Sequence, residues 1–404
     1  MSMARRGLLL LGLLSALIVG LSGVENGARA APPASRGGAS FGSDGYADLA
    51  IGVALEDVGA ISNAGAANVL YGGAGGAQAE GDQFWHQDSD GVEGGAEAGD
   101  FFGSSVAAGD FNGDGYPDLA IGVASEDVEA SAGAGAANVL YGTAAGLSAA
   151  SDQIWHQDSA GVEDEAEAGD LFGNSVAAGD FNGDGYADLA IGALYEDVGA
   201  LANAGAVNVL YGTAAGLSAA GDQFWHQDSD DVAGVAEAGD LFGFSVAAGD
   251  FNGDGYADLA IGARLEDVGA SAAAGAVNVL YGTAAGLSAA SDQIWHQDSA
   301  GMEDEAEAGD NFGYSVAAGD FNGDGYADLA IGAPYEDVEA ILDAGAVNVL
   351  YGTAAGLSAA GDQIWHQDSA GVEGDGAEAS DRFGSGLAVL PPRFGLYLPV
   401  VRSP

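Results

Sequence analysis

The sequence has no cysteine and no lysine, and only 8 of its 404 residues are basic. Without cysteine the chain cannot be stapled by disulfides, so something else, such as bound metal, has to stiffen it. Asp and Glu together number 61, which gives a formal net charge of −53. A charge of this size and sign disfavours nucleic acid and anionic membranes as partners.

One long apolar run stands near the N-terminus. Arg5 and Arg6 precede it, and the small-residue sequence Ala28-Arg29-Ala30 follows. A charged start, an apolar centre of this length and small residues at the end are typical of a secretory signal peptide, here residues 1–30. The alternative, a membrane anchor, is disfavoured because the run is short. We therefore expect a protein that is secreted or held at the cell surface, with no membrane span in the mature chain.

A period of 70 residues runs through the rest of the chain. Leu-Ala-Ile-Gly recurs five times, as do Asn-Val-Leu-Tyr-Gly and Trp-His-Gln-Asp-Ser. Each repeat predicts four short strands separated by Gly-rich turns, with no helical period between them. In one repeat these strands cover residues 102–109, 116–123, 136–141 and 153–157. The pattern predicts an all-β fold, a β-propeller of five four-stranded blades.

The ends of the chain suggest how such a ring closes. The first repeat lacks its first strand, whereas a spare strand, residues 383–390, follows the last repeat. Placed in the first blade, this C-terminal strand would close the ring and remove its open edges. The predicted propeller then covers residues 31–390, and residues 391–404 form a short apolar tail suited to docking or sorting. The alternative is an open solenoid with capped ends.

Four of the repeats contain an oxygen-rich loop of the form Asp-Phe-Asn-Gly-Asp-Gly-Tyr-x-Asp. Side-chain oxygens stand at positions 1, 3, 5 and 9, and a glycine at position 6 allows a sharp turn. Hard oxygen ligands on a tight loop favour Ca²⁺, with Mg²⁺ ranked second and a metal-free Asp/Gly turn as the alternative. A fifth loop carries Ser40 and Gly42 at two ligand positions, so we predict about four Ca²⁺ ions. The predicted metal residues are Asp110, Asn112, Asp114, Tyr116, Asp118, Asp180, Asn182, Asp184, Tyr186, Asp188, Asp250, Asn252, Asp254, Tyr256, Asp258, Asp320, Asn322, Asp324, Tyr326 and Asp328.

The Phe-Gly pairs, the Asp-x-Asn-x-Asp-Gly-x-x-Asp loops and the following Asp-Leu-Ala-Ile-Gly closely resemble those of FG-GAP repeat proteins. That group includes the β-propeller of integrin α-chains and many bacterial secreted proteins, and the resemblance covers about residues 41–390. It implies that the loops bind calcium on one face of a propeller and that ligands bind the opposite face. The chain departs from the integrin pattern in having five blades against seven.

Differences among the repeats single out candidate ligand-binding residues. The turns on the calcium-loop face are nearly invariant, whereas the loops on the other face vary. Aromatic residues and one arginine occupy positions where sister repeats carry Ser, Leu or Asn, which suggests a binding patch rather than a neutral surface, although drift among duplicated repeats is the alternative. The predicted ligand-binding residues are Tyr195, Phe244, Arg264, Tyr314 and Tyr335.

No singular catalytic constellation is visible. All five histidines and all five tryptophans belong to the repeated Trp-His-Gln-Asp-Ser, so we predict that these tryptophans pack between blades and that no catalytic residue is present. The repeated Glu-Asp-Val either braces a loop or binds further cations. The sequence thus predicts a monomeric, secreted, non-enzymatic module that binds an extracellular protein or glycan. The rival predictions are a secreted hydrolase or lyase on a propeller scaffold and a structural cell-envelope protein.

Overall fold

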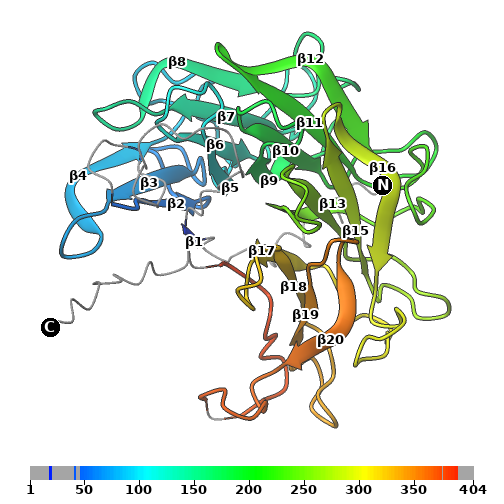
Figure 1. The fold of residues 1–404 in the computed structure, drawn as a ribbon. Coiled ribbons are helices and arrows are strands. Elements are labelled where there is room, and N and C mark those ends of the chain that lie inside the picture. The colour runs from blue at the N-terminus through cyan, green and yellow to red at the C-terminus, as the bar shows by residue number, and fades with distance from the viewer. Residues whose placement is uncertain (1–17, 21–40, 42–45, 375, 390–404) are drawn as a thin grey trace, which may run out of the picture.

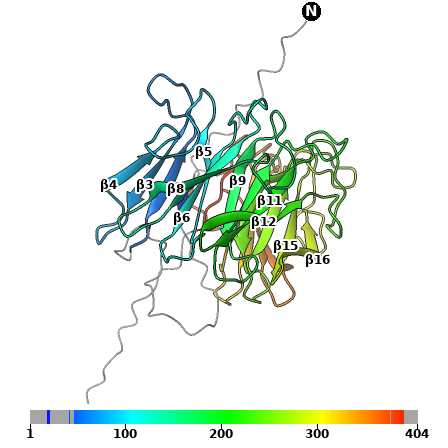
Figure 2. The same cartoon turned by 90° about the horizontal axis from the view of Figure 1, so that it is seen from above.

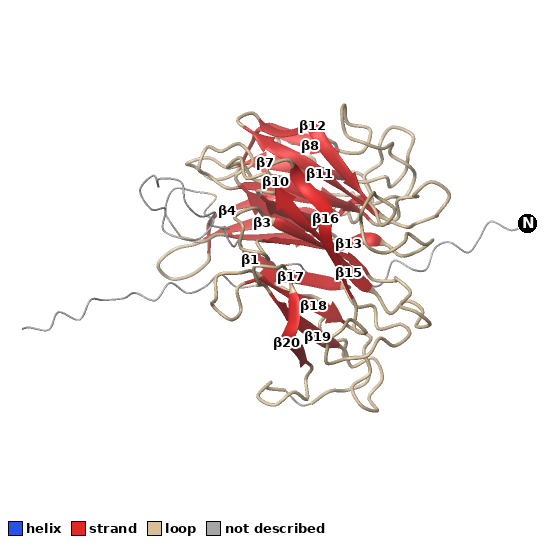
Figure 3. Ribbon diagram, turned by 45° about the vertical axis from the view of Figure 1, so that its right-hand side comes forward, coloured by secondary structure: helices blue, strands red, loops and turns tan. Residues whose placement is uncertain are grey.

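A computed structural model describes residues 18–20, 41, 46–374 and 376–389 of the chain. These residues form five four-stranded antiparallel sheets, which we call blades 1 to 5 in chain order (Figure 1). Figure 3 shows strands and loops throughout, and no helix in the described ranges is long and apolar enough to cross a membrane. The predicted all-β propeller of five four-stranded blades is confirmed in this architecture.

Each blade consists of four strands in sequence order. The strands of blades 1 and 2 are β1 (Ile18–Gly20), β2 (Leu49–Val53), β3 (Ala66–Tyr71), β4 (Gln78–Trp85), β5 (Phe102–Gly109), β6 (Asp118–Val123), β7 (Ala136–Tyr141) and β8 (Ser148–Trp155). Those of blades 3 to 5 are β9 (Phe172–Gly179), β10 (Asp188–Ala193), β11 (Ala206–Thr213), β12 (Gly216–Trp225), β13 (Phe242–Gly249), β14 (Asp258–Ala263), β15 (Ala276–Thr283), β16 (Gly286–Trp295), β17 (Ser315–Gly319), β18 (Asp328–Ala333), β19 (Ala346–Tyr351) and β20 (Ser358–Trp365).

The blades stack face to face, so their middle strands are covered on both sides (Figure 2). This explains why the second strand reads as a continuous apolar run: all six residues of β14 are buried. Glycines allow the closest approach between blades. A Cβ on Gly192 of blade 3 would lie 2.2 Å from the carbonyl oxygen of Gly243 in blade 4, and the Ser175 hydroxyl donates a hydrogen bond to the same oxygen at 2.7 Å. The Ile-Gly and Phe-Gly motifs are therefore two sides of one contact.

The structure agrees closely with the predicted strands of the second repeat. The bounds of β5 and β7 are those predicted. The second strand begins at Asp118 rather than residue 116, because the Tyr116 N–H donates to Asp114 within the loop. The fourth strand begins at Ser148 rather than residue 153, because the Gly-rich turn already pairs Tyr141 with Ser148. It ends at Trp155 rather than residue 157, because the His156 N–H donates to Ser159 Oγ in the following turn.

Closure by a C-terminal strand is not what the structure shows, so this part of the prediction needs correction. Residues 383–389 are not a strand; they pack against blade 5, and the position beside β2 is taken by Ile18–Gly20, which lies inside the predicted signal peptide. Blades 1 and 5 stand at the two ends of an arc in Figure 1, and residues 383–389 are not paired with β2 among the described residues. The predicted residue 390 and the tail 391–404 lie outside the described residues.

Candidate functional site

The two ends of the strands carry different chemistry. Each oxygen-rich loop joins the first two strands of a blade, and the Gly212 N–H of the last turn in blade 3 donates to Asp188 of that loop at 2.9 Å. Arg264 follows β14 at the other end of the strands. The predicted cation loops and the predicted ligand patch therefore lie on opposite faces, as the strand order requires.

Side chains at positions 1, 3 and 5 of each loop turn inward onto the loop backbone. In blade 3, the Asp184 N–H donates to Asn182 Oδ1 at 2.8 Å, and the Gly185 N–H donates to Asp180 Oδ2 at 3.0 Å. Gly183 and Gly185 have positive φ angles of 70° and 95°, which L side chains rarely adopt, so glycine is needed for this turn. The corresponding loops of blades 2, 4 and 5 repeat these bonds. Carboxylate and amide oxygens so arranged suit a hard cation.

The aspartate at position 9 accepts hydrogen bonds from backbone groups of its own loop and of the neighbouring turn. Asp188 is fully buried and accepts hydrogen bonds from the N–H groups of Phe181, at 2.8 Å, and Gly212. Burial raises its pKa to about 8, and the nearby loop carboxylates add to the shift. Asp118 and Asp258 behave in the same way. The aspartate at position 9 joins the loop to the neighbouring turn. The residues at positions 1, 3, 5 and 7 are therefore the main candidates for cation ligands.

Histidine and carboxylate groups alone do not build a metal centre in the part of the chain that the structure describes, since no three such side chains gather around one point there. Any cation in these loops would therefore need the Asn oxygens and backbone carbonyls as well. In the first repeat, residues 42–45 are outside the described ranges, but Asp48 still accepts from the Gly72 N–H at 2.7 Å. The tie at position 9 is thus kept even where two ligand positions are replaced.

The five predicted ligand-binding residues lie together on the opposite face, and we call them the aromatic patch. The rings of Phe244 and Tyr314 are 5.0 Å apart between centroids, and those of Tyr314 and Tyr335 are 6.3 Å apart. The Arg264 guanidinium carbon lies 4.3 Å from the Phe244 centroid and 5.4 Å from the Tyr314 centroid. Tyr195 belongs to the same apolar cluster. Three blades contribute to this patch, which sequence spacing alone does not bring into contact.

Arg264 is held by ring faces rather than by a carboxylate. Its Nη1 donates to Asn311 Oδ1 at 3.0 Å, while its buried Nε has no partner among the described residues. Burial lowers the pKa of this guanidinium, and the neighbouring Tyr314, Tyr195 and Tyr335 partly oppose that shift. A cation stacked on aromatic rings gains from the ring quadrupoles, and more so when it is partly desolvated.

Sequence reasoning missed several residues of this face. Leu194 and Leu241 pack against Phe244, and the Arg382 guanidinium carbon lies 4.7 Å from the Tyr335 centroid. Leu241 and Arg382 both precede a Phe-Gly pair and both have positive φ angles, of 61° and 56°. This position could have been identified from the sequence, because its residue also varies among the repeats. The full set at this position is Phe101, Leu171, Leu241, Asn311 and Arg382.

The repeated Trp-His-Gln-Asp-Ser is a brace between blades. Trp225 packs in the cluster shared by blades 3 and 4, as predicted. The His226 N–H donates to Ser229 Oγ at 3.0 Å and shapes the turn, and Gln227 Nε2 donates to Glu266 of the next blade at 2.8 Å. Asp267, beside that glutamate, accepts from a backbone N–H of its own loop at 2.8 Å. These bonds favour bracing over cation binding for the Glu-Asp-Val motif.

Comparisons with known proteins agree with this architecture. The FG-GAP repeat matches residues 102–140, 172–210, 242–280 and 312–350. Integrin alpha-3 of Cricetulus griseus is 31% identical over 199 residues, covering 48% of this chain and 17% of that protein. Integrin alpha-5 of Xenopus laevis is 31% identical over 239 residues, covering 58% and 20%. The chain thus spans a fifth or less of the length of these relatives.

One further relative and two solved structures bear the names of enzymes. Phosphatidylinositol-glycan-specific phospholipase D of Bos taurus is 33% identical over 164 residues, covering 40% of this chain and 18% of that protein. Among solved structures, rhamnogalacturonan lyase YesW superposes with a TM-score of 0.37 at 11% identity, covering 87% of this chain and 76% of that one. The exotype rhamnogalacturonan lyase YesX gives a TM-score of 0.36 at 13% identity, covering 66% and 46%.

Stacked four-stranded blades with a Phe-Gly contact at each junction and an oxygen-rich loop at one end define a β-propeller repeat protein. The chain contains four FG-GAP repeats, and these repeats are similar to parts of integrin alpha chains.

The prediction that the protein is not an enzyme does not stand. The phospholipase D named above is 33% identical to this chain over 164 residues, so proteins similar to this chain include an enzyme as well as integrin chains. Repetition of the histidines around the ring argues only against a site built from them. The absence of a familiar catalytic motif in the sequence is therefore no ground for excluding catalysis.

Proposed function

We propose that the protein is a secreted, calcium-binding FG-GAP propeller that binds an extracellular protein or glycan through the aromatic patch. The observation that carries the proposal is the convergence of the repeat-specific residues. Phe244, Arg264 and Tyr314 differ from their counterparts in sister repeats, and yet they contact one another across two blades. Residues that differ from their counterparts in the sister repeats and lie together are not required by the fold of the repeat. Their clustering therefore favours a role in binding.

Calcium is proposed for the opposite face. Four loops offer oxygen ligands at positions 1, 3 and 5, and each loop is anchored by its buried aspartate at position 9. Adjacent loops are linked, because the Ala257 N–H of blade 4 donates to the carbonyl oxygen of Asp180 in blade 3 at 3.0 Å. Cation binding at one loop would therefore stabilise a junction as well as a turn. In a chain with a net charge of −53, bound Ca²⁺ would also relieve repulsion between carboxylates.

The binding proposal is tested by a screen of the mature chain against glycans and matrix proteins, followed by variants of the patch. Replacing both Tyr195 and Tyr335 with Ser should abolish binding to whatever the screen yields. It should cost little stability, roughly 1 kcal/mol or less per site, because sister repeats carry Ser or Leu at this position. The matched control is Phe84→Ser, which removes an aromatic ring that is 48% exposed and lies outside the patch.

Two results would contradict the proposal. One is unchanged binding by the tyrosine double variant. The other is loss of binding on substitution of the exposed residues Ala284 and Ala285 in the last turn of blade 4, which would move the functional surface to the calcium-loop face. Either result would leave the fold intact and reassign the site.

A second candidate function is enzymatic, and the similarity to the phospholipase D supports it. The test is hydrolysis of a phosphatidylinositol-glycan by the purified mature chain, with and without Ca²⁺. Turnover that survives repeated purification and is lost in a patch variant would assign the activity to this chain. No turnover in either condition would leave the binding function as the proposal.

A further inference from the structure

Four blade junctions bury the same set of side chains. At the junction of blades 3 and 4, Val209, Tyr211 and Trp225 of the earlier blade pack against Leu259 and Leu287 of the later one. The equivalent residues meet at the other three junctions. Each blade therefore has a forward face, which needs a leucine-bearing partner.

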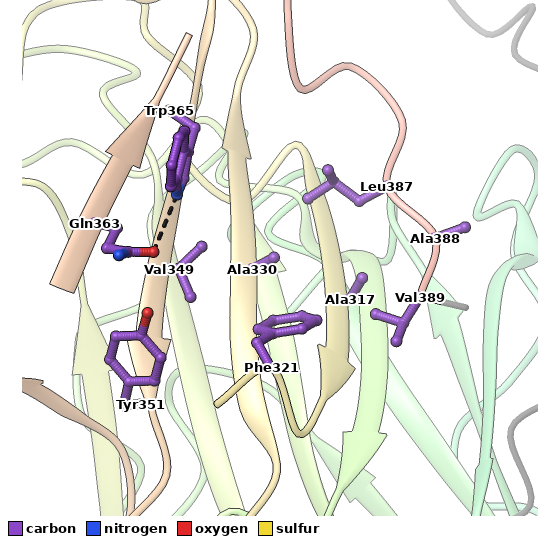
Figure 4. Close-up of a pocket in the computed structure, with 10 residues that line it drawn as sticks. All are labelled: Ala317, Phe321, Ala330, Val349, Tyr351, Gln363, Trp365, Leu387, Ala388 and Val389. Atoms are coloured by element: carbon purple, nitrogen blue, oxygen red, sulfur yellow. Dashed lines mark hydrogen bonds between the residues drawn. The ribbon is translucent and has the colours of Figure 1, made fainter. Parts of the chain in front are cut away.

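The forward face of blade 5 has no such partner in the part of the chain that the structure describes. Its cluster contains Val349, Tyr351 and Trp365, but the partners are Phe383 and Leu387 from the following segment instead of a blade. A cavity of about 320 Å³ remains there (Figure 4).

Gln363, the glutamine on the forward face of blade 5, also lacks, among the described residues, the partner that its counterparts have at the other junctions. At the other junctions the glutamine side chain and a leucine backbone of the next blade bond to each other, as Gln223 and Leu287 do. Gln363 instead accepts a hydrogen bond from Trp365 Nε1 of its own strand at 3.2 Å (Figure 4). Tyr351 is only partly buried, whereas its counterpart Tyr211 is 8% exposed.

Blade 1 is a poor partner for this face. The leucine that each junction buries from the last turn corresponds to Ala77 in blade 1. Figure 1 places blades 1 and 5 at opposite ends of the arc, and their strands are not among the principal neighbours of one another. Blade 1 therefore has the character of an end repeat, and such repeats differ from the internal ones.

The chain itself supplies a better partner. Leu387 and Val389 line the cavity, so residues 390–404 start at its edge. This tail contains Leu396 and Leu398, which share one side of an extended segment. It carries two of the eight basic residues and no Asp or Glu, so the body of the protein attracts it electrostatically. Extended, it reaches on the order of 50 Å, enough to run along a blade.

We propose that residues 390–404 lie on the forward face of blade 5 and take the place that the following blade takes at the other four junctions. Leu396 and Leu398 fill the cavity beside Tyr351 and Trp365, and the backbone of the tail offers Gln363 the partner that leucine backbones offer elsewhere. The tail is then an end cap that keeps an apolar sheet face from water. This role is independent of ligand binding at the aromatic patch.

Hydrogen–deuterium exchange of the full chain and of a chain ending at residue 389 tests the proposal. Deletion of the tail should speed exchange in residues 346–365 by about tenfold, as expected for loss of one or two buried leucines. Residues 276–295, the same strands in blade 4, are the internal control and should not change. A synthetic peptide of residues 390–404 should restore protection to the shortened chain, and the same peptide with Leu396→Asp and Leu398→Asp should not.

The full chain carrying Leu396→Asp and Leu398→Asp provides a second variant if the deletion misfolds. It should show the same local loss of protection. Equal exchange in residues 346–365 with and without the tail would overturn the proposal. So would protection that rises with protein concentration while the full chain sediments as a dimer, because a second copy would then cover the face.

Discussion

Gln223 of blade 3 and Leu287 of blade 4 hold each other through two hydrogen bonds. The Gln223 Nε2 donates to the Leu287 carbonyl oxygen at 2.9 Å, and the Leu287 N–H donates to Gln223 Oε1 at 2.9 Å. The Tyr211 hydroxyl also donates to this oxygen. One side chain thus satisfies a backbone donor and a backbone acceptor at a junction where water is excluded.

Replacing Gln223 with Leu should lower the free energy of unfolding by roughly 1–3 kcal/mol, because both Leu287 backbone groups would be left buried without partners. Denaturant unfolding followed by tryptophan fluorescence measures the change. The matched control is Gln363→Leu in a chain that ends at residue 389, because no described backbone group depends on this amide once the tail is removed. A cost at Gln363 equal to that at Gln223 would contradict this account of the junction.

Glu336 should make the protein less stable as the pH rises. Burial, assisted by Asp304 and Asp310, raises the pKa of its carboxyl from about 4.5 to about 9. The folded chain therefore keeps a proton that the unfolded chain releases, and stability falls from about pH 4.5 to about pH 9. Glu336→Gln has no charge to bury and can accept the Gln297 hydrogen bond through its amide oxygen.

This variant should therefore be more stable than the native chain near pH 8, by about 1 kcal/mol or more, and equally stable near pH 4. Thermal melting across this range checks both expectations. Glu56→Gln is the control, since Glu56 is the exposed counterpart in blade 1. A gain of stability at pH 4 as large as that at pH 8 would show that charge burial is not the cause.

Calorimetric titration of the chelated mature chain with Ca²⁺ should reveal four comparable sites. Four loops have the complete set of oxygen positions, whereas the loop of the first repeat has Ser40 and Gly42 at two of them. A fifth site of equal strength would show that water or another segment replaces those two ligands. Titration in high salt separates these sites from weak binding to surface carboxylates, which salt screens.

Asp184→Ala should lower the melting temperature in calcium while leaving ligand binding unchanged. It removes one carboxylate from a loop on the calcium face, far along the strands from the aromatic patch. In the presence of a chelator the variant and the native chain should melt closer together, because neither then has the cation to lose. Asp82→Ala, at an exposed position outside the loops, is the control. An identical loss of stability with and without calcium would assign Asp184 to the turn alone.

Much of the fold follows from the repeat. The 70-residue period locates the strands, because each apolar run is bounded by turn residues that stop it, and β5 and β7 match their predicted bounds. The boundary errors occur at Tyr116, Ser148 and His156, where hydrogen bonds inside a loop or turn decide whether a residue joins the ladder. Propensity carries little information about such local competition.

Part of the candidate site also follows from the sequence. Comparison of the copies identified Tyr195 and Arg264 because they break the repeat, but it did not pair Arg264 with Asn311, whose position was not compared. The strand beside β2 was mispredicted for a different reason. The period gives the order of the blades, whereas the segment that pairs with β2, Ile18–Gly20, lies outside the repeats and shares no motif with them.

The residue before each Phe-Gly pair has a consequence for how such a surface can change. Its backbone is fixed in the left-handed region in all five copies, although the side chain is Phe, Leu, Leu, Asn or Arg. A position whose conformation is imposed by its neighbours can exchange side chains without disturbing the fold. Duplicated repeats thus supply several equivalent backbone positions on one face, each of which accepts different side chains. New binding specificities can arise by combining substitutions at these positions, because the backbone that carries them stays the same.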